Sequence, residues 1–405
     1  MTSPARGLKQ REQTLVTIQA SPIETNQETT VQSSPIDRRR FLVKAFQGGV
    51  GAVAFAAGGG GLLAACGSST TSTSAPTTAG GSSTTASSSG SATKSLGSAG
   101  LQLDWIEDIE FAGSYIAKTN GYYTANGLDV TLMAGGPTTS VEPIVVSGKA
   151  LVGISGPDIT SQAINNGAQL TIIGASMQKA PQAIMSLAKS PILNPQGMIG
   201  KKIGVQAGNL IAFNAFLTLN KIPASQVTIV PVQFDPSPLA AGTVDGWYSF
   251  ITNEPFLLAA KGVATHTFLM YDYGYRLYSG TYCVLTSSLQ DDTKRAQIKA
   301  LMTGEILGWE KAFADPSLAA DLTVNVYGKT NGLDVPTQTK ELAAYEPLYK
   351  TSVTTAHGLM WMDATDIAQN VATLGLLGIK STASYFDNSV LQEIYQGQSS
   401  LAIPA

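Results

Sequence analysis

The sequence predicts an α/β protein of two lobes, one inserted into the other, followed by a helical tail. The first observation is that strand-like and helix-like segments alternate from Leu101 onward, as they do in βα units. The second is that this alternation starts afresh at Pro191, and that a strand-like stretch from Tyr282 then looks like a return to the first set. The third is that 292–405 is mostly helical in pattern. A single doubly wound domain is the alternative interpretation.

The lobe boundaries follow from where each set of segments begins and ends. We expect lobe 1 to comprise 101–190 and 281–405, and lobe 2 to be the inserted stretch 191–280. Two crossover segments must then join the lobes, and we place them near Ala183–Ala188 and Gly280–Ser287.

Apolar alternation predicts the strands, and an apolar period of 3.6 residues with end signals predicts the helices. Gly127 should end the first helix, and Ser155 or Asp158 should cap the helix that begins at Pro157. In lobe 1 the expected strands are 101–105, 128–133, 150–154, 170–175, 183–188 and 282–286, and the expected helices are 111–126, 135–147 and 157–166. In lobe 2 the expected strands are 202–205, 227–232, 244–248 and 265–270, and the expected helices are 209–220, a short one near Pro238, and 253–261.

The composition excludes several classes of function. Hydrophobic residues make up 43% and charged residues 13% of the 405 residues, which is ample material for a core. The net charge of −3 argues against a partner that is a nucleic acid or an anionic membrane surface. Two cysteines and two histidines make a Cys/His zinc site improbable, so we expect no metal and no cofactor.

The first 65 residues are typical of an export signal. The run Asp37-Arg38-Arg39-Arg40-Phe41-Leu42-Val43 resembles the twin-arginine signal, although Asp37 stands where Ser or Thr is usual and Val43 where Lys is common. The stretch 45–65 that follows is apolar but rich in glycine. A permanent membrane span needs about 20 strongly apolar residues, so this stretch fits a cleaved signal better.

The apolar stretch ends in Leu63-Ala64-Ala65-Cys66, which looks like the lipobox of a bacterial lipoprotein. Lipidation of the Cys66 thiol with two acyl chains would anchor the mature protein stably to the outer face of the cell membrane. A chance match inside an ordinary signal is the alternative. The Ser-, Thr-, Gly- and Ala-rich residues 67–100 offer nothing to bury, which predicts a flexible linker behind the anchor.

From residue 101 onward, seven short motifs follow one another along the chain. They are Leu103-Asp104-Trp105, 113–118, Gly121-Tyr122-Tyr123 with Asn126-Gly127-Leu128-Asp129-Val130, 153–158, 200–205, 244–248 and Thr252-Asn253-Glu254-Pro255. In this order and spacing they resemble the thiamine-precursor and riboflavin-type solute-binding proteins, in the superfamily that also includes nitrate, taurine and sulfonate binders. The resemblance implies the type II periplasmic binding protein fold, a monomer, and delivery of a small molecule to the permease subunits of an ABC importer.

Some relatives in this family are enzymes that make the thiamine pyrimidine by sacrificing their own histidine beside a cysteine-rich loop. Here Phe111 stands where that histidine would fall, and the sequence has no cysteine cluster. We therefore expect a binding protein rather than an enzyme. A surface adhesin would explain the Ser/Thr-rich linker but would not need the two-lobed pattern. His266 and His357 are expected to be structural, and Cys283 an inert core thiol.

In lobe 1 the candidate ligand residues follow strand ends, because ligands of open α/β sheets lie beyond the carboxyl ends of the strands. Trp105 ends the first expected strand, where its indole could stack on a flat ring. Core packing is the alternative for Trp105, and a solvated turn is the alternative for the acidic residues after it. The lobe 1 candidates are Trp105, Glu107, Asp108, Phe111, Tyr115, Ser155, Gly156 and Asp158.

Lobe 2 has equivalent junctions between strands and helices. Its candidates are Gln206, Asn209, Tyr248, Asn253, Glu254 and Tyr273. The globular part of the chain, from residue 101 onward, contains only two arginines, Arg276 and Arg295. The proposed cleft, in contrast, is rich in aromatic and acidic residues. This favours a neutral, flat heterocycle with N–H donors, such as a thiamine pyrimidine precursor or riboflavin. An anion such as nitrate or a sulfonate, held by helix N-termini, remains the alternative.

Overall fold

The computed structural model describes residues 94–136 and 138–402. The export signal, the lipobox with Cys66 and the linker up to residue 93 lie outside the described residues, so the expectations about them stay predictions. None of the helices in the described part of the chain has both the length and the apolar character needed to cross a bilayer.

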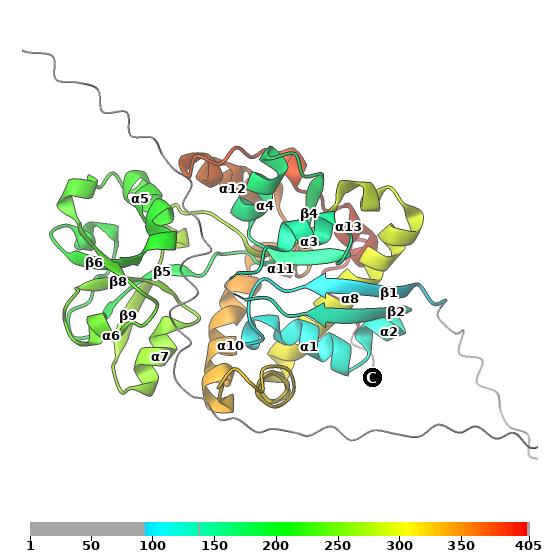
Figure 1. Cartoon of the computed structure of the whole chain (residues 1–405), viewed down its shortest axis with the longest axis horizontal. Coiled ribbons are helices and arrows are strands. Elements are labelled where there is room, and N and C mark those ends of the chain that lie inside the picture. Colours follow the sequence, from blue (N-terminus) through cyan, green and yellow to red (C-terminus); the bar gives the residue numbers. More distant parts are fainter. Residues whose placement is uncertain (1–93, 137, 403–405) are drawn as a thin grey trace, which may run out of the picture. The chain divides into compact units, whose positions relative to one another are not determined.

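Lobe 1 is built on a five-stranded mixed sheet (Figure 1). Its strands lie in the order β2-β1-β3-β10-β4, with β1 parallel to β2 and β3, and β10 antiparallel to β3 and β4. Their bounds are β1 (Gly97–Gln102), β2 (Leu128–Met133), β3 (Val152–Ser155), β4 (Leu170–Met177) and β10 (Ser279–Leu285).

Lobe 2 repeats this arrangement. Its strands lie in the order β7-β6-β8-β5-β9, with β6 parallel to β7 and β8, and β5 antiparallel to β8 and β9. Each lobe therefore has one antiparallel strand in the same place, which is β10 in lobe 1 and β5 in lobe 2. The bounds are β5 (Gln182–Leu187), β6 (Lys202–Gln206), β7 (Thr228–Val232), β8 (Gly246–Phe250) and β9 (Thr265–Leu269).

The chain passes between the two sheets twice, as predicted. It leaves the first sheet after Met177 and enters the second at Gln182, then leaves after Leu269 and returns at Ser279. The first crossover is thus earlier than expected, because the apolar stretch assigned to it is strand β5 of the second sheet. The second is also earlier, because the returning strand begins at Ser279 and includes Gly280.

Helices cover both faces of the first sheet. Helices α1 and α8 pack so closely that a Cβ atom at Gly308 would collide with the carbonyl of Gly113. In this lobe the helices are α1 (Ala112–Thr119), α2 (Tyr122–Ala125), α3 (Val141–Val146), α4 (Pro157–Asn165), α8 (Asp292–Ala314), α9 (Pro316–Asp321), α10 (Val335–Tyr349), α11 (Ser352–His357), α12 (Ala364–Leu376) and α13 (Ser389–Tyr395), with a π-helical turn η8 (Leu322–Tyr327).

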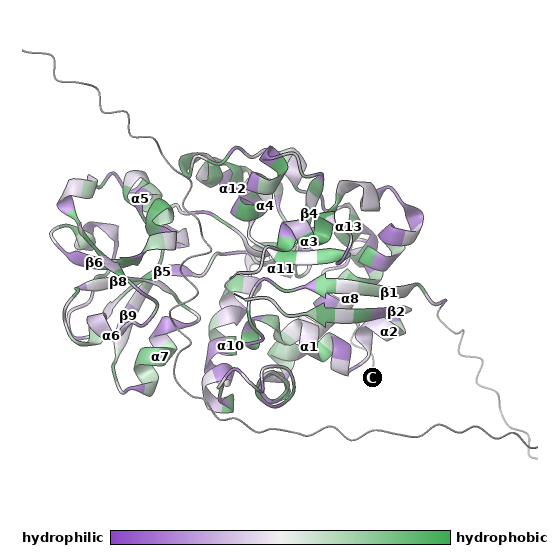
Figure 2. Cartoon of the chain, viewed as in Figure 1, coloured by the Kyte–Doolittle hydropathy of each residue, from purple (hydrophilic) through white to green (hydrophobic). Residues whose placement is uncertain are grey.

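Two apolar clusters form on the second sheet. One includes Phe213 and Phe216 of α5 (Leu210–Leu219), and the other includes Trp247 of β8 with residues of α6 (Ser237–Ala240) and α7 (Glu254–Ala260). Figure 2 shows hydrophobic residues along α5 and along β2 of lobe 1. Leu374 of α12 is buried within the Phe213 cluster, so the C-terminal tail also contacts lobe 2. Short 3-10 helices complete the chain: η2 (Ile109–Phe111), η3 (Pro195–Met198), η4 (Ala207–Asn209), η5 (Ala224–Gln226), η6 (Tyr271–Tyr273), η7 (Thr286–Leu289) and η9 (Ala383–Tyr385).

A buried carboxyl group ties α1, α2, β10 and α8 together. Glu305 of α8 is fully buried and accepts hydrogen bonds from the Ser114 hydroxyl at 2.9 Å, the Tyr282 hydroxyl at 2.8 Å and the Tyr123 hydroxyl. Burial raises the pKa of Glu305 above its usual value, while the three hydroxyl groups act in the opposite direction. The four side chains form a polar network inside an apolar core, and this network is structural.

The main differences from the expected elements lie at the start of lobe 1. Strand β1 begins at Gly97, inside the stretch expected to be linker, and ends at Gln102. The expected helix 111–126 is divided at Gly121, whose φ of 73° suits glycine and interrupts a helix. Helix α3 begins at Val141 rather than at 135.

Candidate ligand-binding site

The loop after β1 places Trp105 beyond the carboxyl end of the strand. The amide of Gln102 donates to the Leu103 carbonyl at 2.8 Å and to the Met133 carbonyl at 3.1 Å, which holds the loop against the end of β2. The Trp105 carbonyl accepts from the Gly135 N–H at 2.9 Å. With its backbone held in this way, the Trp105 side chain remains 37% exposed. This exposure rules out the alternative that Trp105 is a core residue, and its role in ligand binding stays a prediction.

Three carboxyl groups surround this loop. Asp108 accepts from the Glu110 N–H at 2.9 Å and caps η2, while Asp104 has a buried oxygen, Oδ1, without a hydrogen-bond partner. Burial raises the pKa of Asp104 to about 7, with help from the Asp108 and Glu142 carboxyl groups. Burial also raises the pKa of Asp108 to about 7. The pKa of Glu110 is raised well above its usual value by burial and by the charges of Asp104 and Asp108.

Helix α10 adds a fourth carboxyl group that the sequence analysis did not identify. The amide of Gln338 donates to Glu341 at 2.7 Å, and its oxygen accepts from the Ile109 N–H at 2.9 Å. Burial, with the Asp108 charge, raises the pKa of Glu341 to about 8. No signal in the sequence could have found this pair, because 229 residues separate Ile109 from Gln338.

The other lobe 1 candidates near this loop are more buried. Phe111 is a core residue. Tyr115 is also fully buried, with its ring stacked on Tyr327 at 4.3 Å between centroids, yet its hydroxyl has no hydrogen-bond partner. The carboxyl groups of Asp108, Glu107 and Glu110 add to burial in raising the pKa of Tyr115. The Glu107 carbonyl accepts from the Asn331 amide at 2.8 Å, and the Glu107 side chain is partly buried.

The junction between β3 and α4 is held from within the lobe. Ser155 is buried, and its hydroxyl donates to Glu142 at 2.6 Å, as the Thr160 hydroxyl does at 2.9 Å. Gly156 is the N-cap of α4, and no side chain caps this helix, which corrects the expected cap by Ser155 or Asp158. Asp158 is partly buried, and burial raises its pKa.

In lobe 2, Gln206 and Asn209 bind each other at the end of β6. The Asn209 amide donates to the Gln206 oxygen at 3.0 Å, and the Gln206 amide donates to the Tyr248 carbonyl at 3.1 Å. The Tyr248 ring is buried and packs edge-on against Phe213. Its pKa is raised by burial, then by Tyr275 and by the carboxyl group of Asp158. Asp158 of lobe 1 and Tyr248 of lobe 2 are therefore within electrostatic range of each other.

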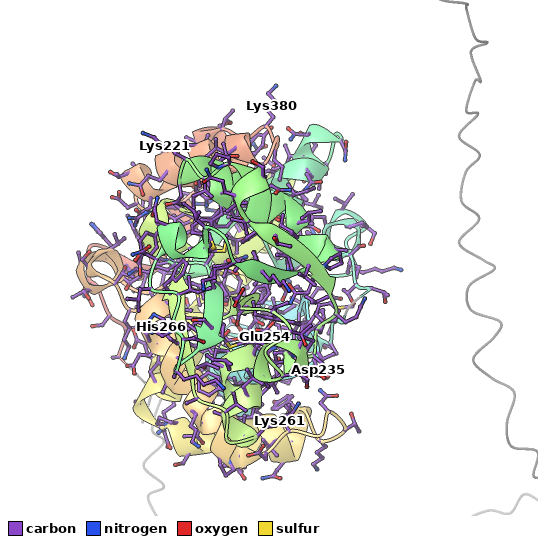
Figure 3. The ribbon with its side chains drawn as sticks, turned by 90° about the vertical axis from the view of Figure 1, so that its left-hand side faces the viewer. Lys221, Asp235, Glu254, Lys261, His266 and Lys380 are labelled. Carbon is purple, nitrogen blue, oxygen red and sulfur yellow. The ribbon has the colours of Figure 1, made fainter. Side chains whose placement is uncertain are left out.

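The remaining lobe 2 candidates have local roles. Glu254 is buried and accepts from the Phe250 N–H at 2.8 Å and the Ser249 hydroxyl at 3.2 Å, which joins β8 to α7. Figure 3 labels Glu254 together with Lys261, which forms an ion pair with Asp235 at 3.5 Å. Asn253 is exposed beside Glu254.

Tyr273 lies apart from the other candidates. Its ring packs edge-on against Phe268 at 5.2 Å between centroids. Its hydroxyl donates to the Leu193 carbonyl at 3.4 Å, and its carbonyl accepts from the Asn220 amide at 3.2 Å. These contacts make Tyr273 part of the packing of lobe 2.

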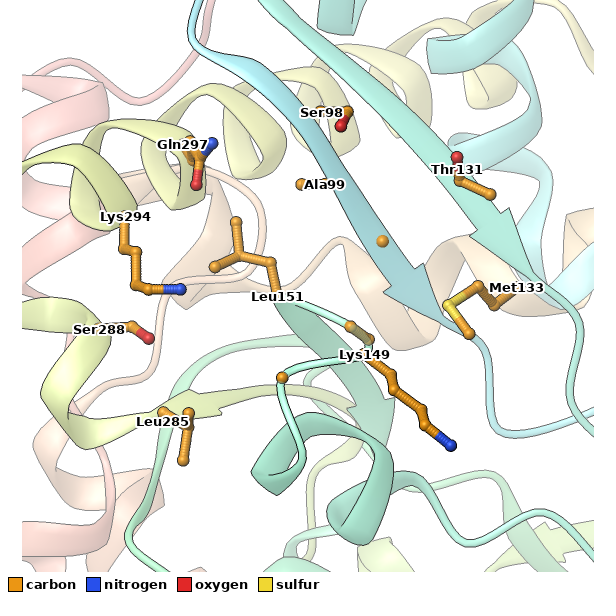
Figure 4. Close-up of a pocket in the computed structure, with 13 residues that line it drawn as sticks. Ser98, Ala99, Thr131, Met133, Lys149, Leu151, Leu285, Ser288, Lys294 and Gln297 are labelled. Atoms are coloured by element: carbon orange, nitrogen blue, oxygen red, sulfur yellow. The ribbon is translucent and has the colours of Figure 1, made fainter.

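Two surface cavities in the described part of the chain lie away from the candidate residues. A cavity of about 420 Å³ lies beside the start of β1, where Figure 4 shows Lys149 and Lys294 among its lining residues. Another of about 490 Å³ lies near Arg295 and Phe386. A cavity of only about 10 Å³, the size of one water molecule, adjoins Glu110 and Tyr349.

His357 packs on an aromatic ring, and Cys283 lies in the core. His357 stacks on Trp361 at 5.0 Å between ring centroids. Cys283 is fully buried, and burial raises the pKa of its thiol to about 12. Within residues 94–136 and 138–402, no group of three or more His, Cys, Asp or Glu side chains is arranged to hold a metal ion.

Comparison with known proteins identifies the family. A family model described as NMT1/THI5 like matches residues 108–319, just over half of the chain. The chain belongs to the NMT1/THI5-like family. This confirms the predicted resemblance. This chain is also similar to the riboflavin-binding protein RibY of Chloroflexus aurantiacus, with 23% identity over 287 residues that cover 67% of this chain and 79% of RibY.

Solved structures agree on the fold of this NMT1/THI5-like protein. It is similar to the periplasmic aliphatic sulphonate binding protein SsuA of Escherichia coli, with 16% identity, a TM-score of 0.51, and coverage of 69% of this chain and 86% of SsuA. It is also similar to the ligand-binding component of an ABC-type import system from Staphylococcus aureus, with 11% identity, a TM-score of 0.52, and coverage of 73% and 99%. The fold is the two-lobed type II periplasmic binding protein fold, with two crossovers and a helical C-terminal tail.

Proposed function

We propose that this protein is the extracytoplasmic solute-binding component of an ABC importer, and that it captures a small, flat heterocycle between its lobes. One observation carries the proposal: Trp105 is exposed at the carboxyl end of β1, with Asp104, Asp108 and Glu110 around the same loop. The indole offers a flat apolar face, and the carboxyl groups accept hydrogen bonds from ring N–H or amino groups. The family membership and the fold support the importer role.

The charge of the loop favours this ligand class over sulfonate or nitrate. An anion placed against Asp104, Asp108 and Glu110 would be repelled by whichever of these carboxyl groups are ionised. In the described part of the chain, none of the three forms an ion pair with a lysine or arginine that could offset the repulsion. A thiamine pyrimidine precursor or the isoalloxazine of riboflavin presents N–H groups on a flat ring and suits the same surface.

A ligand that contacts both lobes should favour the closed form of the protein. A ligand stacked on Trp105 that also reaches lobe 2 makes more contacts when the lobes are closed, so it shifts the population toward closure. A shift from 1:99 to 99:1 needs about 5.5 kcal/mol of differential affinity. One stacked ring and a few hydrogen bonds supply energy of that order. A permease that recognises the closed form would then receive loaded protein.

We propose that the protein binds its ligand without converting it chemically. The position where pyrimidine-synthesising relatives would carry their histidine is the buried Phe111, and the one cysteine in the described residues, Cys283, is buried and protonated at neutral pH. The experiment that tests the proposed function is native mass spectrometry of the protein purified from its own host. A co-bound aromatic heterocycle would support the proposal, and a co-bound sulfonate would overturn the ligand class.

A lipid anchor at Cys66 would hold the protein at the outer face of the membrane, where a permease can be reached. We predict that Cys66→Ser moves the protein from the membrane fraction to the soluble fraction, because the thiol that accepts the acyl chains is lost. Immunoblotting of the two fractions measures this shift, with Cys283→Ser as the matched control that stays membrane-bound. Membrane retention of Cys66→Ser equal to that of the wild type would contradict the anchor.

A further inference from the structure

The loop after β1 gathers carboxyl groups that have no basic partner. Asp104, Asp108 and Glu110 act on one another electrostatically, and Glu341 of α10 feels the Asp108 charge as well. Within the described residues, all seven ion pairs of the protein lie elsewhere, so no lysine or arginine compensates these four groups. Buried carboxyl groups without a cation are unfavourable in the ligand-free protein.

A second observation, independent of the charges, points to a ligand at the same place. The hydroxyl of Tyr115 has no hydrogen-bond partner although the residue is fully buried, and it lies within electrostatic range of Asp108 and Glu110. Oδ1 of Asp104 is also buried and without a partner. Buried polar atoms are rarely left unpaired in folded proteins, so two of them beside an acidic cluster indicate a missing partner.

We propose that the missing partner is an organic cation, and that the ligand binds with its positive charge against Asp104, Asp108 and Glu110. This inference rests on the proposed function and narrows its ligand class from a neutral heterocycle to one with a protonated amine or amidine. A metal ion is not the occupant, because no group of three or more potential ligands in the described residues is arranged to hold one.

The groups that face the cluster come from five elements. They are Glu107 of the loop, Glu142 of α3, Tyr115 of α1, Tyr327 of η8, and Glu341, Tyr345 and Tyr349 of α10. All of them are acidic or phenolic, and none can supply a positive charge.

The cation should bind together with proton release. The pKa values of Asp104 and Asp108 are raised to about 7, so both carboxyl groups are largely protonated at lower pH and ionise as the pH rises through about 7. A cation favours the ionised form, and its binding therefore expels protons from the cluster. Affinity for a cation should increase with pH across this range, whereas affinity for a neutral ligand of the same shape should not.

A matched pair of probes tests the inference by isothermal titration calorimetry on the intact protein. The cationic probe is 4-amino-5-aminomethyl-2-methylpyrimidine, and the neutral probe is the 5-hydroxymethyl compound with the same ring. We expect the cation to bind roughly tenfold or more tightly than the neutral probe at about pH 7.5, where the pyrimidine ring of both probes is unprotonated. Titrations in two buffers of different ionisation enthalpy should show release of about one proton per bound cation.

Asp104→Asn with Asp108→Asn should abolish the preference and the proton release, while Asp292→Asn, at the exposed first residue of α8, serves as the matched control and retains both. Thermal melting confirms that each variant is folded. If the neutral probe or riboflavin binds as tightly as the cation without proton release, the cation inference is overturned and the proposed function stands. If neither pyrimidine nor riboflavin binds, whether or not taurine does, the cation inference and the proposed ligand class are both overturned.

Discussion

Trp105→Ala should weaken the binding of any flat heterocycle by about 2–3 kcal/mol, which is roughly 30- to 150-fold in Kd. The loss combines the apolar area that the indole covers on the ligand with the energy of ring stacking. The side chain is 37% exposed, so its removal leaves no cavity in the core. The melting temperature of the ligand-free protein should therefore stay close to that of the wild type. Titration calorimetry with the ligand found by native mass spectrometry measures the change in Kd.

Leu193→Ala is the matched control for this prediction. Leu193 is 60% exposed and follows β5, whose end lies opposite the carboxyl ends of the parallel strands. Its truncation removes exposed apolar surface of lobe 2 without touching the loop after β1, and should leave the Kd unchanged. If Trp105→Ala and the wild type bind the ligand with equal affinity, Trp105 is not part of the binding surface.

Glu305→Ala should lower the free energy of unfolding by about 3–5 kcal/mol. The substitution leaves the hydroxyl groups of Ser114, Tyr123 and Tyr282 without their shared acceptor, in a core where water cannot replace it. It also opens a cavity between α1 and α8. Glu305→Gln keeps an acceptor oxygen and most of the side-chain volume. It should therefore lose clearly less free energy of unfolding than Glu305→Ala. Urea denaturation followed by circular dichroism measures both.

The matched control is Glu346→Ala on α10, which removes a half-buried glutamate that pairs with Lys350 one helical turn away. Such a pair contributes about 0.5 kcal/mol or less, so this variant should melt close to the wild type. The pH dependence of stability gives a further check. The pKa of Glu305 is raised in the folded state, so its contribution to stability falls as the pH rises above the unfolded value of about 4.3. If Glu305→Ala loses as little free energy of unfolding as Glu346→Ala, the hydrogen-bond network of Glu305 does not stabilise the core.

Most strands were predictable because their local pattern agrees with their final environment. Strand β2 has the expected bounds, since Gly127 breaks the chain before it with a φ of 81° and buried and exposed residues alternate at its start. The expected strand 101–105 begins later than β1 does, because the residues from Gly97 to Gly100 are poor in β-branched side chains. Pairing of these residues with β2, Gly97 opposite Leu128 and Gly100 opposite Thr131, overrides the weak local preference.

The candidate site was predictable only in part, and the reason is distance along the chain. Trp105 and Asp108 were selected as candidates because they follow a strand, and the carboxyl ends of strands are where ligands lie. Gln338 and Glu341 reach the same loop from α10, and no local pattern indicates that contact. Tyr273 was selected for its aromatic neighbourhood, which instead completes the packing against Phe268.

Closure of the two lobes around a ligand is the central claim, and an interlobe distance tests it most directly. Spin labels at Gln162→Cys on α4 and Asn214→Cys on α5 would place one exposed reporter on each lobe, in a Cys66→Ser background that leaves only the buried Cys283. Pulsed electron resonance then gives the distribution of distances between them. We predict that a saturating ligand shifts this distribution to shorter distances and narrows it, and that Trp105→Ala shifts only at much higher ligand concentration. An unchanged distribution with the ligand fully bound would contradict the account.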